Sequence, residues 1–268
     1  MKSISLGLGL LSIGRQWGVR NVSPPPPAQS VALINAAAEQ GIRFFDTAPA
    51  YGGSEKLLGQ AIDAEPSKFA AAMIATKAGE HWIDDTRATY VDHSYDAMCR
   101  SIDRSLEYLG RITLLQIHKT STDVLARADL PAVIRYAESC GIKEFGASVS
   151  DVETARVALD SGKFGWLQFP FNGSSTAFKD IFPVLHDQQL KAIINRPFAM
   201  GKIALSGDQA RKAAFGFILE AGLPPDSVIL TGTSSEVHLS ENISCFETAQ
   251  LELAGAQKTS SGNHERSD

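Results

Sequence analysis

The sequence has few cysteines, no long apolar run and no block of basic residues, and each absence excludes a class of protein. Its three cysteines form no CxxC pair and have no metal-ligand spacing, so we expect reduced thiols and no metal site. No apolar stretch approaches the roughly 20 residues of a membrane span, which argues against a membrane protein. The net charge of −5 is spread along 268 residues, which argues against a nucleic-acid partner.

The N-terminal segment lacks a cleavage signal, and the C-terminal segment lacks an apolar pattern. The segment MKSISLGLGLLSIG has no small-residue cleavage site, so we predict no signal peptide and a cytoplasmic location. The tail at 255–268, GAQKTSSGNHERSD, is polar and has no apolar periodicity, which predicts disorder. We therefore expect a single domain over 1–254, and a monomer because no additional interface element is apparent.

Short apolar runs alternate with amphipathic stretches along the chain. The amphipathic stretches, at 30–40, 55–62, 94–109, 151–161 and 236–253, have helical periodicity after capping residues such as Ser30 and Ser54. This alternation predicts parallel strands joined by crossover helices. The glycines of GLGLLSIG lack the GxGxxG spacing of a Rossmann fold, so we predict a (β/α)8 TIM barrel. The eight expected strands are 4–8, 43–46, 73–77, 114–118, 144–148, 166–170, 191–196 and 228–231.

Polar residues stand where several of these strands end. The active site of such a barrel lies at the carboxyl ends of its strands, so these side chains are expected to meet. Asp46 and Lys77 end neighbouring strands, and each can neutralise the other if both are buried. The full set is Asp46, Lys77, His118, Ser148, Gln168 and Asn172.

Tyr51 follows Asp46 in the stretch RFFDTAPAYGGSE. A nearby lysine is expected to lower the pKa of a phenol, which would make Tyr51 a general acid near neutral pH. His118 could hydrogen-bond and orient an incoming oxygen. No serine or cysteine has an obvious base neighbour, so acyl transfer is a poor fit. The set suits protonation of a carbonyl oxygen while hydride reaches the carbon.

Each of these residues taken alone has a more ordinary structural interpretation, as a loop cap, a solvated lysine or a hydrogen-bonded core histidine. Their occurrence together at consecutive strand ends favours a catalytic role over these structural ones. A lyase that uses Lys77 as a Schiff-base nucleophile is an alternative, although Asp46 would keep that amine charged.

Several segments resemble the aldo-keto reductase family. They are GIRFFDTAPAYGGSEKLLGQAI, ATKAGEHW, SIDRSLEYLGRITLLQIHKTS, GASVSDVETA and VILTGTSSEVHLSENI, and they extend over residues 4 to about 250. The resemblance implies a barrel that binds NADP(H) or NAD(H) across its mouth and acts on a small carbonyl substrate. It also implies a tetrad, with Tyr51 as proton donor, Lys77 and Asp46 tuning it, and His118 orienting the carbonyl.

The resemblance implies further contacts. The cofactor-binding positions are Ser148, Gln168, Asn195, Arg196, Gly232, Thr233, Ser234, His238, Glu241 and Asn242. Candidates for the substrate pocket, by position, are Trp17, Trp82, Phe171 and Phe198. Since some barrels of this family serve as cofactor-sensing channel subunits, a regulatory barrel with little turnover is a second alternative.

The sequence departs from the family pattern near the cofactor. Val149 stands where the family usually has asparagine, and the segment with Asn195 and Arg196 lacks the usual stacking aromatic. Gly232 and His238 stand where many NADPH-preferring members carry lysine and arginine. Histidine is only partly charged at neutral pH. NADP(H) is favoured by the resemblance, and NAD(H) remains open.

Overall fold

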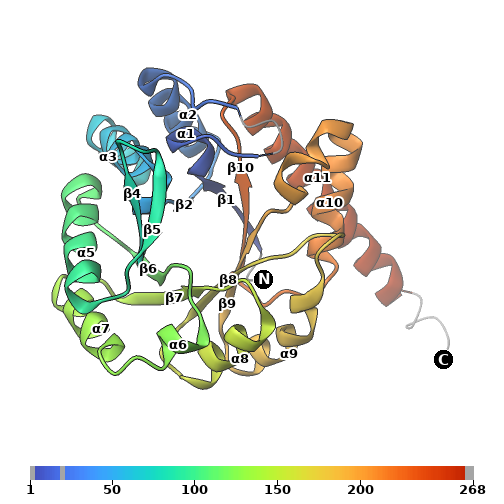
Figure 1. Ribbon diagram of the computed structural model, residues 1–268. Coiled ribbons are helices and arrows are strands. Elements are labelled where there is room, and N and C mark those ends of the chain that lie inside the picture. The colour runs from blue at the N-terminus through green and yellow to red at the C-terminus, as the bar shows by residue number, and fades with distance from the viewer. Residues whose placement is uncertain (1–3, 19–21, 263–268) are drawn as a thin grey trace.

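The chain folds as a closed barrel of eight parallel strands, which confirms the predicted (β/α)8 architecture. The computed structural model describes residues 4–18 and 22–262. The strands pair in the order β1-β10-β9-β8-β7-β6-β3-β2 (Figure 1), and each predicted strand is found within one residue of its expected ends. The barrel strands are β1 (Ser5–Gly9), β2 (Phe44–Asp46), β3 (Met73–Ala78), β6 (Leu114–Ile117), β7 (Glu144–Ser148), β8 (Trp166–Pro170), β9 (Lys191–Asn195) and β10 (Val228–Gly232).

Helices surround the barrel on its outside (Figure 1). The five predicted helices correspond to α2, α3, α5, α8 and α11. The α-helices are α1 (Leu11–Gly14), α2 (Pro27–Glu39), α3 (Ser54–Ala64), α4 (Pro66–Phe69), α5 (Tyr95–Leu109), α6 (Thr122–Leu125), α7 (Leu130–Ser139), α8 (Val152–Asp160), α9 (Phe182–Asp187), α10 (Asp208–Leu219) and α11 (Glu236–Gly262). Short 3-10 helices are η1 (Pro49–Tyr51), η2 (Ala177–Ile181), η3 (Ala199–Gly201) and η4 (Ala204–Ser206).

Two helix boundaries differ from the sequence expectation. Helix α2 begins at Pro27 rather than after a Ser30 cap, because proline has no N–H to leave unpaired in a first turn and its φ already suits a helix. Helix α11 continues to Gly262, past residue 255, where the polar tail begins. Alanine, glutamine and lysine in this segment are good helix formers, so polarity alone does not end the helix. Residues 263–268 of that tail lie outside the described part of the chain.

An antiparallel hairpin, β4 (Glu80–Ile83) and β5 (Ala88–Val91), follows β3 and was not expected from the sequence. It packs against η1, which carries Tyr51. The hairpin is separate from the barrel sheet. It therefore adds a wall beside the carboxyl ends of β2 and β3.

Strand side chains alternate between the barrel interior and the helices, as the two-residue period requires. Phe44, Ala75 and Leu114 belong to a small buried cluster with Trp166, whereas their neighbours Phe45, Ile74 and Leu115 pack in the large cluster beneath the helices. The same alternation turns the next residues of β2 and β3, Asp46 and Lys77, inward. No helix within the described ranges is long and apolar enough to cross a membrane.

Candidate active site

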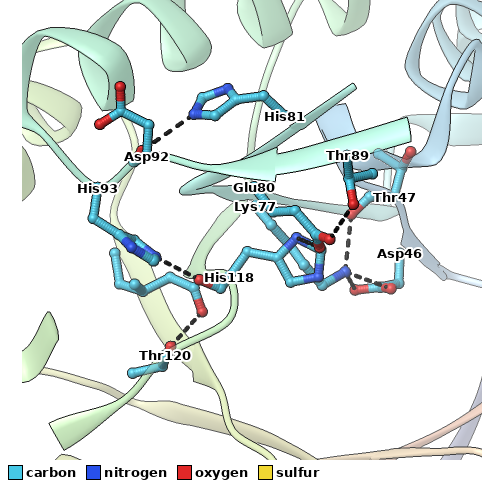
Figure 2. Close-up of polar contacts among 11 residues, drawn as sticks. Asp46, Thr47, Lys77, Glu80, His81, Thr89, Asp92, His93, His118 and Thr120 are labelled. Atoms are coloured by element: carbon cyan, nitrogen blue, oxygen red, sulfur yellow. Dashed lines mark hydrogen bonds and ion pairs between the residues drawn. The ribbon is translucent and has the colours of Figure 1, made fainter. Parts of the chain in front are cut away.

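Asp46 and Lys77 form a buried ion pair at the carboxyl ends of β2 and β3. Lys77 Nζ lies 2.7 Å from each carboxylate oxygen of Asp46 and donates to the Thr47 carbonyl at 2.9 Å (Figure 2). Gln116 Nε2 donates to Asp46 Oδ1 at 3.0 Å. Burial lowers the pKa of Lys77, but the charges and hydrogen bonds of Asp46 and Tyr51 outweigh it and raise that pKa overall. Lys77 therefore remains an ammonium.

Tyr51 ends the short helix η1 and faces this pair. Lys77 Nζ lies 4.9 Å from the centroid of the phenol ring. Gly14 packs closely behind it, since a Cβ at Gly14 would lie 1.7 Å from the Tyr51 carbonyl oxygen. The backbone at the end of helix α1 thus fixes the position of Tyr51.

The expectation of a lowered phenol pKa was wrong. Burial raises the pKa of Tyr51 more than the Lys77 charge lowers it, and the charges of Asp46 and Glu80 raise it further. The sequence indicated the lysine but not the burial. The phenol therefore keeps its proton near neutral pH, as a proton donor must.

His118 follows β6 and meets Tyr51 edge-on, with ring centroids 5.8 Å apart and planes at 81°. Its Nδ1 lies 3.2 Å from Glu80 Oε2. Its backbone carbonyl is 2.7 Å from His93 Nε2 (Figure 2). Burial lowers the pKa of His118 well below its usual value, and the positive charge of Lys77 lowers it further. His118 is thus neutral at neutral pH.

A cavity of 790 Å³ opens at this end of the barrel. Asp46, Tyr51 and His118 line it, whereas Lys77 lies behind them, with 1% of its surface exposed. That volume lies in the range of small-molecule and cofactor sites. No group of three or more metal-ligating side chains occurs among the residues that the structure describes.

Most residues proposed for the cofactor line the same cavity. They are Ser148, Gln168, Asn195, Arg196, Gly232, Thr233, Ser234, His238 and Asn242. Glu241 does not line it, because its carboxylate accepts from Arg211 Nη1 at 2.8 Å. Asn172 is also absent from the lining, and its amide donates to the Arg196 carbonyl at 2.9 Å.

The cavity wall contains buried acceptors without a protein partner. Gln168 Oε1, Asn195 Oδ1 and Asn242 Oδ1 accept no hydrogen bond from the described residues. Unpaired buried acceptors are costly, so they fit a ligand that brings N–H and O–H donors, such as a nicotinamide carboxamide and ribose hydroxyls. The residues present therefore fit a nicotinamide dinucleotide.

Of the four aromatic candidates for the substrate pocket, Trp17 and Phe198 line the cavity. Trp82 does not; its indole donates to Asp84 Oδ1 at 2.9 Å. Phe171 is fully buried and packs on Phe182. The inference for Phe171 was wrong because the residue lies an odd number of positions after the inward-facing Gln168.

Three lining or supporting residues were missed in the sequence. Gln116 stands two residues before His118, so the strand period already turned it inward toward Asp46. Glu80 reaches the cavity only because the hairpin folds back over η1. Arg15 lines the cavity and lies over the Trp82 ring at 5.8 Å, and no local pattern marked it.

Comparison with known proteins agrees with this geometry. A family model described as "Aldo/keto reductase family" matches residues 5–218 of the chain. The chain is 30% identical over 238 residues to a D-threo-aldose 1-dehydrogenase of Pseudomonas, covering 75% of this chain and 68% of that one. It is 26% identical over 219 residues to L-galactose dehydrogenase of Arabidopsis thaliana, covering 77% and 65%.

Solved structures share the fold. An aldo-keto reductase of Bacillus halodurans superposes with a TM-score of 0.74 at 17% identity, covering 91% of this chain and 86% of that one. The glycerol dehydrogenase of Gluconobacter oxydans does so with 0.70 at 21% identity, covering 93% and 90%.

The relatives are longer proteins. The chain spans 65%, 55% and 61% of the lengths of three curated relatives. The family match nevertheless extends over most of the barrel, from β1 into α10, and includes the tetrad of Asp46, Tyr51, Lys77 and His118. The chain belongs to the aldo/keto reductase family.

Proposed function

We propose that the protein is an NAD(P)(H)-dependent oxidoreductase that interconverts a small carbonyl compound and its alcohol. The observation that carries this proposal is the arrangement of a protonated phenol at the cavity wall beside a buried Asp46–Lys77 pair, with His118 facing it at the wall of the same cavity. When bound, the nicotinamide supplies or accepts hydride at the substrate carbon.

The residues of the chain handle the proton. Tyr51 donates its phenolic proton to the carbonyl oxygen during reduction. Lys77, fixed by both oxygens of Asp46, stabilises the phenolate that remains. Such a preorganised charge costs no rearrangement during the reaction, which is why electrostatic stabilisation of this kind is effective. His118 positions the substrate oxygen next to Tyr51.

The cofactor would lie across the mouth of the barrel. Ser148 and Gln168 are register partners on β7 and β8, and they suit the carboxamide of the nicotinamide. Gly232, Thr233 and Ser234 precede α11, whose first-turn N–H groups favour phosphate. Arg196 lies over the Trp17 ring at 5.9 Å. This pair suits the pyrophosphate in the middle of the cofactor, and no aromatic takes the place of the one that usually stacks on the nicotinamide at the end of β9.

The resemblance favours NADP(H), and the charges near α11 favour tolerance of NAD(H). Arg211 lines the cavity but is held by Glu241 at 2.8 Å and by Asp208. Its charge is therefore largely committed to acidic partners rather than free for a 2′-phosphate. We expect the protein to use both NADPH and NADH, and to discriminate between them less strongly than a site with an arginine free for the 2′-phosphate.

The substrate is proposed to be a small aldehyde, ketone or sugar. Trp17 and Phe198 give the cavity an aromatic component, and two relatives are named for sugar substrates. We further propose a cytoplasmic monomer, with 1–254 as one domain. The burial of Lys77 behind the cavity wall, with 1% exposure, counts against a Schiff-base lyase, since the amine must reach substrate.

The test is nucleotide consumption by the purified protein with NADPH and NADH separately, against aromatic, aliphatic and sugar carbonyls. Tyr51→Phe keeps the ring and removes only the proton donor. We expect turnover by the wild type and its loss in Tyr51→Phe, with nucleotide binding retained. Tight binding without turnover in the wild type would support the regulatory alternative instead, and no binding would overturn the proposal.

A further inference from the structure

Glu80 is a buried carboxylate beside His118 that the mechanism above does not use. It begins β4, is 4% exposed and lines the cavity. Its Oε1 accepts from Thr89 Oγ1 at 2.9 Å, and its Oε2 lies 3.2 Å from His118 Nδ1 (Figure 2). Among the described residues, His118 is the group that forms an ion-pair contact with Glu80.

His118 Nδ1 is itself buried and has no well-aligned hydrogen-bond partner among the described residues. Glu80 Oε2 is thus the acceptor within reach of this nitrogen. A neutral imidazole carries one proton, and an adjacent partner decides which nitrogen carries it. Beside a carboxylate, that nitrogen is Nδ1.

We propose that Glu80 is a positioning residue that holds the proton of His118 on Nδ1, so that Nε2 is presented to the cavity as a hydrogen-bond acceptor. The Glu80–His118 pair then carries one proton in its resting state. The hydroxyl of an alcohol can donate a hydrogen bond to Nε2. A carbonyl oxygen cannot, because it needs an N–H donor there.

For a carbonyl to be oriented by His118, the pair must bind a second proton. That proton makes Nε2 an N–H donor. Glu80 therefore couples the binding of a carbonyl, but not of an alcohol, to proton uptake. This consequence rests on the proposed oxidoreductase function, whereas the position of the His118 proton does not.

The surroundings of His118 support the singly protonated pair. Tyr51 from η1 faces its ring, and the charges of Lys77 on β3, Lys119 and Arg15, with His93 ahead of α5, disfavour an imidazolium. Burial lowers the pKa of His118 most, ahead of these charges. Glu80 is the carboxylate in contact with the ring, at 3.2 Å from Nδ1.

Imidazole ¹⁵N chemical shifts, measured through long-range ¹H–¹⁵N correlations at pH 7.5, report the proton position without any turnover. The chain has six histidines, and a His118→Gln spectrum assigns the signal. We expect the Nδ1–H form in the wild type and a shift toward the Nε2–H form in Glu80→Gln, which lacks the carboxylate charge. An Nε2–H form in the wild type, or the same form in both proteins, would overturn the proposal.

Thr89→Val is the matched control, because it removes the hairpin hydrogen bond to the same carboxylate but keeps the charge. It should retain the Nδ1–H form. For carbonyl reduction, we divide kcat/KM of Glu80→Gln by kcat/KM of the wild type. We expect this ratio to rise with pH by up to about tenfold per pH unit, since the variant needs no second proton. A ratio that does not change with pH would refute the coupling, even if the ¹⁵N result holds.

Discussion

The buried Asp46–Lys77 pair gives a prediction about stability that is independent of any activity. Lys77→Met keeps a long flexible side chain and removes the ammonium. Asp46 would then retain only the Gln116 amide as a donor among its observed partners. Because Asp46 is 2% exposed, little water can reach its carboxylate to replace the lost ammonium.

The expected cost follows from this burial. Breaking a buried ion pair from one side typically costs about 3–5 kcal/mol. The double variant, Lys77→Met with Asp46→Asn, leaves neither position charged and should be less destabilised than the sum of the single variants, with a coupling of about 2–3 kcal/mol. The assay is the free energy of unfolding from urea titration.

Lys68→Met is the matched surface control. Lys68 pairs with Glu39 at 2.5 Å and also with Glu65, but solvent screens these pairs, so the same substitution should change stability far less. Equal losses in Lys68→Met and Lys77→Met would refute the reasoning from burial. Additive effects of Lys77→Met and Asp46→Asn would refute the coupling.

Three further outcomes are expected from the site. Tyr51→Phe should lower kcat/KM by roughly 10²–10⁴-fold, as loss of a general acid does, while nucleotide affinity measured by fluorescence titration stays within a few fold. Gly14→Ala places a Cβ 1.7 Å from the carbonyl oxygen of Tyr51, and Gly59→Ala places one 1.8 Å from that of Tyr108, so each should lower the free energy of unfolding by about 1–3 kcal/mol. At a temperature where both variants are folded, only Gly14→Ala should also lower kcat, and equal kcat values would contradict the role of Gly14. The pKa of His118 is lowered in the folded protein, so as pH falls below about 6.5 the unfolded chain binds a proton before the folded one does. The free energy of unfolding should therefore fall by up to about 1.4 kcal/mol per pH unit there. His118→Gln should show a smaller fall, and an identical pH dependence would argue against a neutral buried His118.

The barrel could be predicted because strand and helix periods are local properties of the chain. The eight apolar runs indicated the strands. The two-residue alternation along a strand was then enough to predict that Asp46 and Lys77 point into the barrel. The same alternation contained the information that Gln116 faces Asp46 and that Phe171 faces the helices. Those two positions could have been inferred from the sequence.

The remainder depended on tertiary packing. The β4–β5 hairpin brings Glu80 to His118 by folding back across η1, which no local pattern indicates. The raised pKa of Tyr51 depends on its burial, which the sequence did not reveal even though Lys77 was recognised. Glu241 was drawn away from the cavity by Arg211, a partner 30 positions distant in the chain.

The central claim is that hydride from a nicotinamide reaches a carbonyl held beside Tyr51. The most direct measurement is a single-turnover reaction with NADPH or NADH carrying deuterium at the transferable C4 position, followed by mass spectrometry of the alcohol. The account predicts one deuterium on the carbinol carbon, with product formation strongly slowed in Tyr51→Phe. Product without deuterium, or equal rates in both proteins, would contradict it.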